Sequence, residues 1–258
     1  ATAAKKSGRI AAEGIVKAYV DGNVGVLVEV NSETDFVAKN DEFQQFVSDV
    51  AKTIAEQNPA DVEALKELKC GDSTIGEMLT EKIAKIGENM NIRRFARIET
   101  TGAVVDYIHA AGKIGVLVEA DTDASGEAID ECMKNIAMQV AAANPGYVDE
   151  ASVPAEVVAK EKEIMLAQMA GDPKTANKPE AVKQKMIEGK IKKFFKENCL
   201  VDQEFVKDGD LTVAQYTAKV AKDLGGDIKI VKFARFQKGE GLEKRADDFA
   251  AEVASMVK

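Results

Sequence analysis

Two apolar runs around a short polar loop near the start of the chain predict a β-hairpin. Residues 15–20 and 24–30 form two apolar runs, which Asp21-Gly22-Asn23 separates. A short loop of this composition between strand-like runs is a strong hairpin signal, because its residues accept the backbone angles of a tight turn. The small and basic residues 1–14 are expected to form an N-terminal arm that leads into the first strand.

A helical periodicity follows this hairpin. Between residues 41 and 56 the apolar side chains recur every three or four positions, which places them on one face of a helix: Phe43, Phe46, Val47, Val50 and Ile54. Asn58-Pro59 should end this helix, since the residue before a proline disfavours helical backbone angles. Two shorter helices are expected at residues 61–69 and 75–84, and a strand at residues 92–99.

The second half of the chain repeats this pattern. Gly115-Val116-Leu117-Val118-Glu119 is identical to Gly25-Val26-Leu27-Val28-Glu29. Residues 107–120 again hold two strand-like runs, and residues 127–143 again carry an amphipathic helical pattern that Asn144-Pro145 closes. These matches predict that one structural unit occurs twice in the chain.

The final strand of the unit is repeated as well. Residues 224–237 match residues 86–99 at five positions, namely Gly225, Ile230, Phe233, Ala234 and Arg235. Each unit is thus a hairpin, a helix, a helical connection and a final strand. Strands and helices grouped in this way favour an α+β fold with antiparallel sheets over a doubly wound parallel sheet. We expect one subdomain at residues 15–100 and a related one at residues 101–153 with 197–240.

Residues 154–196 interrupt the second copy with two narrow apolar stripes. Residues 171–179, which contain glycine and two prolines, separate the stripes and predict a turn. We therefore expect an inserted antiparallel helical hairpin, or coiled coil. Two narrow stripes bury little area, so the hairpin is either a protrusion or a contact for a partner or a second copy. Residues 241–258 are expected to form a C-terminal amphipathic helix.

Charge and composition narrow the possible functions. The chain has 258 residues, 45% of them hydrophobic, which is enough for one large or two small cores. A net charge of -9 and a pI near 5.0 weigh against binding to nucleic-acid phosphates. No apolar run reaches the ~18 residues of a membrane span, and no signal-peptide core is present. Three distant cysteines fit a reducing compartment. The start at Ala1-Thr2 suggests a processed or trimmed product.

The sequence lacks the residue sets of most enzymes. His109 is the only histidine, which argues against histidine metal clusters and nucleophile–histidine arrangements. The sequence contains neither a phosphate-binding loop nor a Gly-x-Gly-x-x-Gly turn. We therefore expect no metal, no cofactor and no enzymatic activity. A basic stretch at residues 190–193 leaves a ribosome- or RNA-associated adaptor as an alternative function.

The residues between the first hairpin and the following helix admit two interpretations. Asp35 and Phe36 follow the strand of residues 24–30 and precede the helix of residues 41–56. Taken alone, they fit a capped helix start, with Asp35 at the positive end of the helix dipole and Phe36 in the core. Residues at such a junction also often project from the body of a protein and carry function.

Residues 29–40, Glu-Val-Asn-Ser-Glu-Thr-Asp-Phe-Val-Ala-Lys-Asn, resemble the signature of the elongation factor Ts family. Members of that family are guanine-nucleotide exchange factors for elongation factor Tu. Further matching motifs occur in the same order at residues 85–94, 107–118, 203–206 and 239–253, so the resemblance covers nearly the whole chain. It implies two α+β subdomains, a coiled-coil insertion and a C-terminal helical module. Family members usually begin with a small helical domain, which we expect to be missing here.

The resemblance implies seven partner-contact residues, namely Asp35, Phe36, Ile86, Gly87, His109, Val206 and Phe249. By this resemblance, the first two enter the nucleotide-binding domain of elongation factor Tu beside its magnesium site, and the next two support the same surface. His109 and Val206 would contact the barrel domain of the partner. The helix around Phe249 would rest on the nucleotide-binding domain.

The function implied is that of an exchange factor that binds no nucleotide itself. It would hold nucleotide-free elongation factor Tu more tightly than the nucleotide-bound form, so that by linkage the nucleotide leaves faster. No contact with nucleic acid or membrane is expected, whereas a homodimer through the inserted hairpin is possible. The expected location is the bacterial cytoplasm, or alternatively an organellar matrix or stroma after processing.

Overall fold

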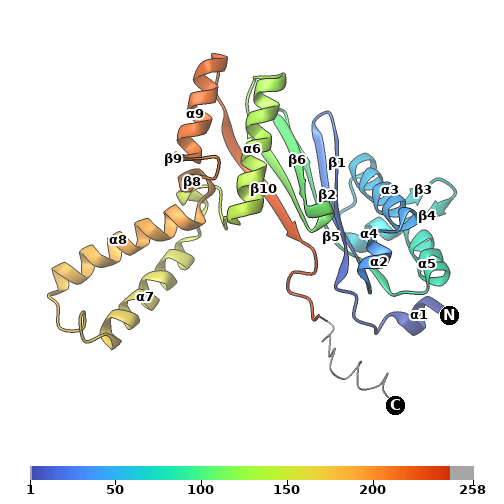
Figure 1. The fold of residues 1–258 in the computed structure, drawn as a ribbon, viewed down its shortest axis with the longest axis horizontal. Coiled ribbons are helices and arrows are strands. Elements are labelled where there is room, and N and C mark those ends of the chain that lie inside the picture. The colour runs from blue at the N-terminus through green and yellow to red at the C-terminus, as the bar shows by residue number, and fades with distance from the viewer. Residues whose placement is uncertain (1, 245–258) are drawn as a thin grey trace, which may run out of the picture. The chain divides into compact units, whose positions relative to one another are not determined.

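A computed structural model describes residues 2–244 of the chain (Figure 1). Helices and small antiparallel sheets make up these residues, which confirms the α+β fold class. The described chain packs as two compact units. Unit 1 contains residues 2–99, 106–117 and the segment from residue 236 onward, and unit 2 contains residues 100–105 and 118–235.

The sheet of unit 1 is built on the predicted hairpin. Strands β1 (Glu13–Asp21) and β2 (Val24–Ser32) pair antiparallel around the turn, with Val20 opposite Gly25. Strand β5 (Met90–Glu99) adds to the other side of β2, which gives the order β1-β2-β5. Thus β2 is the central strand.

One face of this sheet is covered by helix α3 (Asp41–Gln57), which packs on β1 and β2. The five apolar residues that predicted this helix are all at most 1% exposed, and they meet the valines of β2 in one core. Asn40 caps the first turn of α3, and Asn58 ends the helix in a left-handed conformation, with φ of 47°. The prediction for this helix is confirmed.

Short elements complete the first copy of the unit. They are helix α1 (Thr2–Lys6), helix α2 (Asp35–Ala38), helix α4 (Val62–Lys66), the paired strands β3 (Lys69–Cys70) and β4 (Ser73–Thr74), and helix α5 (Ile75–Ile86). The loop that follows α5 leads directly into β5. The β1–β2 hairpin begins shortly after α1, and α2 follows it directly.

The second face of the unit 1 sheet is covered by residues 106–117. Gly115 lies so close to it that a Cβ atom there would stand 2.5 Å from Val16 Cγ1 and 2.7 Å from Leu27 Cδ1. As a result β2 is buried on both faces, from Gly25 to Ser32. A polar side chain on this strand must find its partners inside the protein.

The second copy of the unit follows the same plan. Strands β6 (Ala103–His109), β7 (Ile114–Asp121) and β10 (Lys229–Gln237) form a sheet in which β7 is central, as β2 is in the first. Helix α6 (Glu127–Ala143) matches α3 in length and ends at Asn144 in the same left-handed conformation. Short connecting turns are 3-10 helices, at Ala110–Gly112, Glu150–Ser152 and Leu200–Asp202.

The helical connection is duplicated in detail. Strands β8 (Glu204–Phe205) and β9 (Asp208–Thr212) precede helix α9 (Val213–Leu224), as β3 and β4 precede α5. Both α5 and α9 begin with a capping box, at Thr74 and Thr212, and both end at a left-handed glycine. Such boxes satisfy the first free N–H groups of a helix. The bounds of α9 were not predicted from the sequence.

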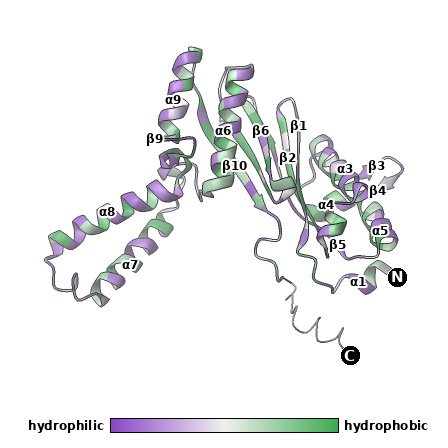
Figure 2. Cartoon of the chain, in the orientation of Figure 1, coloured by the Kyte–Doolittle hydropathy of each residue, from purple (hydrophilic) through white to green (hydrophobic). Residues whose placement is uncertain are grey.

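The inserted hairpin consists of helix α7 (Ala155–Gly171) and helix α8 (Glu180–Asn198), which lie side by side in Figure 1. Hydrophobic and hydrophilic residues alternate along both helices in Figure 2. Its small core is formed by Met169, Ile187 and Ile191. At the base, Gly146 and Tyr147 donate backbone hydrogen bonds to Asn198 O, which closes the stem.

The compact units and the duplicated sequence units divide the chain differently. The sequence grouped residues 101–153 with 197–240, whereas residues 106–117 and the segment from residue 236 onward belong to unit 1 by packing. The reason is that these two segments lie against the first sheet: Gly239 N donates to Glu29 of β2, and Gly115 touches β1 and β2. Residues 245–258, which include the predicted contact Phe249, lie outside the described residues.

Candidate partner-binding site

Helix α2 is a single turn that leaves Phe36 in solvent. Thr34 caps it, with Oγ1 accepting a hydrogen bond from Val37 N at 3.4 Å. Val37 and Ala38 are buried, whereas Phe36 is 79% exposed. The interpretation in which Phe36 packs into the core is therefore wrong. A four-residue helix buries only part of its surface, and here the buried part excludes the aromatic ring.

The backbone that carries Phe36 is braced by the loop after α5. The carboxylate of Glu88 accepts hydrogen bonds from the N–H groups of Glu33 and Thr34, both at 3.1 Å, and from Thr34 Oγ1 at 2.6 Å. In return Glu33 Oε1 accepts from Asn89 N at 2.6 Å. The two loops are thus held together by reciprocal bonds, which fixes the direction of α2.

Ile86 and Gly87 directly precede Glu88 and determine where its side chain lies. Ile86 is the last residue of α5 and packs, half-buried, against the core of unit 1. Gly87 follows with φ of 90°, a conformation that other residues rarely adopt, and its N–H caps the helix through Ile83 O. The chain can therefore turn sharply and deliver Glu88 to Thr34. The structure thus places Asp35, Phe36, Ile86 and Gly87 on two neighbouring loops that hydrogen bonds hold together.

Asp35 stays ionised beside the exposed ring. Its Oδ2 lies 2.8 Å from Lys39 Nζ, and this hydrogen bond lowers the pKa of Asp35 and raises that of Lys39. Both side chains are more than half exposed, so the pair adds little to stability. Because an exposed pair exchanges partners at small cost, Asp35 is available to accept hydrogen bonds from a docking protein.

A cavity of about 680 Å³ opens beside Phe36. Asp35 and Phe36 contribute one part of its lining, and the end of β10 with the residue that follows it contributes another, through Gln237 and Lys238. Ile10, which is 39% exposed, adds a second apolar side chain, and Glu13 and Lys113 add charges of opposite sign. This mixture of an aromatic ring, an aliphatic side chain and charges of both signs is typical of a protein-binding surface.

The other predicted contact residues lie elsewhere. His109 ends β6 in unit 1, and its Nδ1 lies 3.0 Å from the Tyr107 hydroxyl. Val206 is 52% exposed in the turn between β8 and β9 of unit 2. The side chain of Gln139, itself buried, holds this turn by accepting from Val206 N at 2.8 Å and donating to Glu204 O at 3.0 Å. Gln139 was not predicted.

The family comparison bears on this site directly. The family model described as Elongation factor TS matches residues 33–240, a range that begins at the braced turn and includes Phe36, the first copy of the unit after its β-hairpin, the whole second copy and the inserted helical hairpin.

The chain belongs to the elongation factor Ts family. The elongation factor Ts of Syntrophotalea carbinolica is 51% identical over 260 residues, which cover 99% of this chain and 84% of that protein. That of Clostridium perfringens is 50% identical over the same shares, and that of Clostridium kluyveri is 46% identical over 263 residues. The recognition made from residues 29–40 is confirmed, and the protein is a translation elongation factor of the Ts type.

Two kinds of feature are absent from the part of the chain that the structure describes. Among residues 2–244, no group of three or more histidine, cysteine, aspartate or glutamate side chains is arranged to hold a metal ion. Within the same described residues, no helix has the length and apolar character needed to cross a membrane. The predictions that the protein takes no cofactor and no metal stay predictions.

Proposed function

We propose that this elongation factor Ts family member is a guanine-nucleotide exchange factor that accelerates GDP release from elongation factor Tu. The observation that carries the proposal is the exposed ring of Phe36 on a braced turn, next to an ionised Asp35. Family membership supports the same assignment. In this account the protein acts by binding a GTPase, without chemistry of its own and without a bound nucleotide.

The mechanism is differential binding. An exchange factor must bind the nucleotide-free partner more tightly than the nucleotide-bound one, and the same difference then weakens nucleotide binding. Phe36 is suited to this because its backbone is fixed before docking, so little conformational entropy is lost when the ring is buried. Inserted beside the magnesium site of the partner, the ring would displace groups that hold the metal and phosphates. Asp35 would direct the approach by accepting hydrogen bonds from backbone amides or basic groups.

Further contacts belong to the same proposal. Ile86 and Gly87 support the surface around Phe36, His109 and Val206 meet the barrel domain of the partner, and Phe249 rests on its nucleotide-binding domain. A homodimer through α7 and α8 and a location in the bacterial cytoplasm are also proposed. The relatives described above are bacterial, which supports the location.

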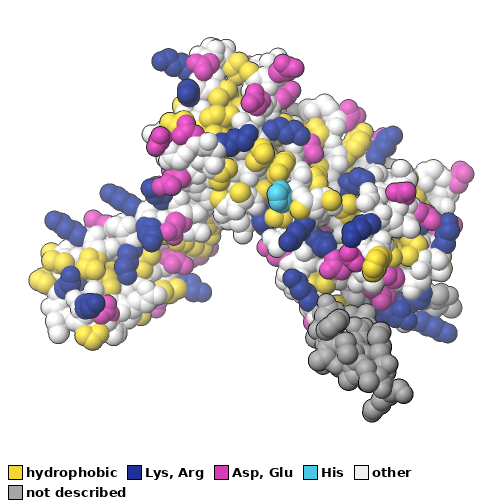
Figure 3. Space-filling model, viewed as in Figure 1, with side chains coloured by type: hydrophobic (Ala, Val, Ile, Leu, Met, Phe, Trp, Pro, Cys, Tyr) yellow, Lys and Arg dark blue, Asp and Glu magenta, His cyan; other side chains and the backbone are white. Residues whose placement is uncertain are grey.

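A nucleic-acid adaptor is the less favoured alternative. Acidic and basic side chains are interspersed on the face displayed in Figure 3, and the net charge is -9. Proteins that bind nucleic acid through phosphates usually gather positive charge on one surface.

The direct test is GDP release from purified elongation factor Tu carrying a fluorescent GDP. A substoichiometric amount of this protein should accelerate release of all the bound nucleotide, because one exchange factor serves many partners in turn. The control is an equal amount of an unrelated acidic protein. Unchanged release, together with RNA binding that weakens steeply with salt, would favour the adaptor instead.

A further inference from the structure

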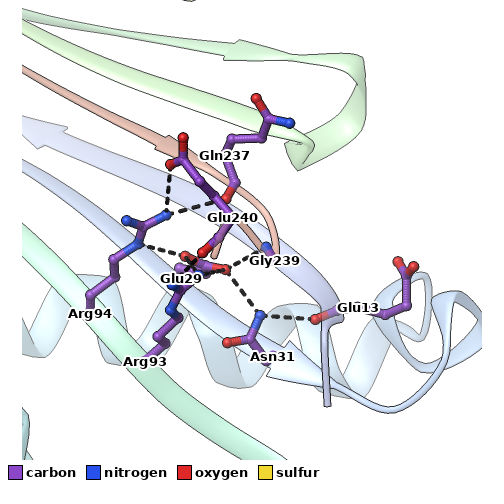
Figure 4. Close-up of polar contacts among 8 residues, drawn as sticks. All are labelled: Glu13, Glu29, Asn31, Arg93, Arg94, Gln237, Gly239 and Glu240. Atoms are coloured by element: carbon purple, nitrogen blue, oxygen red, sulfur yellow. Dashed lines mark hydrogen bonds and ion pairs between the residues drawn. The ribbon is translucent and has the colours of Figure 1, made fainter. Parts of the chain in front are cut away.

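Glu29 is a fully buried carboxylate in the middle of β2, and all of its acceptor capacity is used (Figure 4). Its Oε2 accepts from Arg94 Nε at 2.6 Å. Its Oε1 accepts from Asn31 Nδ2 at 3.0 Å and from Gly239 N at 2.8 Å. Burial alone would raise the pKa of Glu29, but the hydrogen bonds from Gly239, Asn31 and Arg94 outweigh it, and the net pKa is lowered. The side chain is therefore an ionised anchor inside the protein.

A β-bulge brings two arginines to this one carboxylate. Glu29 pairs with Arg94 while the next residue, Val30, pairs with Ile92, which leaves Arg93 as an extra residue in β5. Neighbouring residues of a regular strand point to opposite faces, and a bulge changes this direction. Arg93 Nη1 consequently lies 3.3 Å from Glu29 Oε1, beside the guanidinium of Arg94.

The two arginines also hold the end of β10 and the residues that follow it. Arg94 Nη2 donates to Gln237 O at 3.2 Å, and its guanidinium lies 4.4 Å from the centroid of the Phe236 ring. Arg93 donates to Glu240 O. Glu29, Arg93 and Arg94 thus form one polar cluster that binds residues 236–240 by side-chain and backbone groups (Figure 4).

The segment fits closely against the rest of unit 1. Lys238 N donates to Lys113 O at 2.8 Å, and Lys238 Nζ pairs with Glu13. Gly239 has φ of 70°, and a Cβ atom there would stand 2.4 Å from Ala12 O. Any larger residue would push the segment away from the N-terminal arm.

The second copy of the duplicated unit lacks this cluster. Glu119 occupies the position of Glu29 in the identical sequence Gly-Val-Leu-Val-Glu, but Val231 and Lys232 stand where the first copy has Arg93 and Arg94. Glu119 is only half-buried, and its carboxylate has no side-chain partner among the described residues. The cluster is therefore specific to the copy that carries Phe36.

We propose that Glu29 is a positioning residue for the partner-binding site. It fixes residues 236–240, and this segment lines the same cavity as Asp35 and Phe36 through Gln237 and Lys238. The turn that carries Phe36 has its own brace at Glu88, so the cluster governs the lining of the cavity and not the direction of the ring. The role at the partner interface rests on the proposed function.

Glu29→Gln tests the proposal. A glutamine side chain has only one acceptor oxygen. That oxygen can accept either from Arg94 or from Gly239 and Asn31, and the NH₂ group then faces the remaining donors, with which it cannot form hydrogen bonds. Exchange of the Gly239 amide with deuterium should become faster in this variant. The affinity for nucleotide-free elongation factor Tu should fall about tenfold, whereas the GDP-release rate at saturating concentration should stay unchanged. Glu119→Gln, the same change in the second copy, should alter none of these.

Gly239→Ala reaches the same segment without changing the buried charge. It should give the same faster exchange around residue 239 and the same loss of affinity, and it decides the question if Glu29→Gln fails to fold. If the Gly239 amide stays protected from deuterium exchange in folded Glu29→Gln, Glu29 does not hold residues 236–240. A released segment with unchanged affinity would overturn its role at the site. If even the wild-type protein fails to accelerate GDP release, the proposed function fails. The deuterium-exchange data still test whether Glu29 holds residues 236–240.

Discussion

At Phe36 an aromatic ring remains in solvent while the backbone that carries it is held on both sides. Burying such a side chain typically stabilises a protein by about 1.5–3 kcal/mol, and the fold forgoes this gain. The hydrogen bonds of Glu88 and Thr34 nevertheless hold the backbone that carries the ring. An exposed aromatic side chain on a braced backbone is well suited to serve as an anchor in an interface.

The brace at Glu88 has a measurable consequence. Glu88→Ala removes the acceptor of Glu33 N, Thr34 N and the Thr34 hydroxyl. Because these groups are partly buried, we expect a loss of about 1–3 kcal/mol in the free energy of unfolding. Stimulated GDP release should also slow, since the turn loses its fixed direction. Glu81→Ala, an exposed position on α5, is the matched control and should change neither. Equal behaviour of the two variants in urea unfolding and GDP release would refute the brace.

The pKa of Glu29 predicts a pH dependence of stability. Since the folded-state pKa lies below the ordinary value of 4.5, the ionised side chain stabilises the fold above that value, and this contribution is lost as the pH falls through the folded-state pKa. Glu29→Gln carries no such group. The difference in unfolding free energy between wild type and variant should therefore narrow between neutral pH and about pH 3. Urea unfolding across this range measures it, and a difference that stays constant would contradict the account.

At the scale of elements, the sequence predicted the helices and turns that local residue patterns determine. The spacing of Phe43, Phe46 and Val50 was sufficient for α3, and Asp21-Gly22-Asn23 for the hairpin turn. The brace at Glu88 and the cluster at Glu29 were missed, because Thr34 lies 54 residues from Glu88, and Arg93 and Gly239 lie 64 and 210 residues from Glu29, so that no local pattern marks them. The local sequence could not determine whether Phe36 is exposed, because the same helix-capping pattern occurs whether the ring is buried or exposed.

The inserted hairpin offers a test at this scale. Its core consists of its own residues Met169, Ile187 and Ile191, and its stem is closed by backbone bonds between residues 146–148 and 198–201. Replacing residues 155–196 with a short glycine–serine linker keeps these stem bonds. The shortened protein should unfold cooperatively in calorimetry and retain most of its exchange activity. Loss of cooperative melting would show that the insertion is needed by the core.

At the scale of the whole molecule, two copies of one unit differ in sequence and in local structure. Helices α3 and α6 share their length and a left-handed asparagine at the C-terminus, and α5 and α9 share their length, a capping box and a left-handed glycine. The junction between β2 and α3 carries Thr34-Asp35-Phe36, whereas the junction between β7 and α6 carries Thr122-Asp123-Ala124. The aromatic ring, the one-turn helix and the Glu29 cluster all belong to the first copy. The assignment of residues 106–117 to unit 1 was not predictable, because it depends on packing against the first sheet.

Phe36 is exposed and is not a core residue, and we propose that it is a preorganised exchange element. The measurement is the GDP-release rate of Phe36→Ala with elongation factor Tu, read beside its melting curve. We expect roughly thirtyfold slower stimulated release, equivalent to about 2 kcal/mol of coupling, and a nearly unchanged melting curve. Phe46→Ala, a buried position on α3, should show the reverse, with a loss of about 3 kcal/mol or more in stability and unchanged release per folded molecule. A clearly destabilised Phe36→Ala with unchanged release per folded molecule would contradict the account.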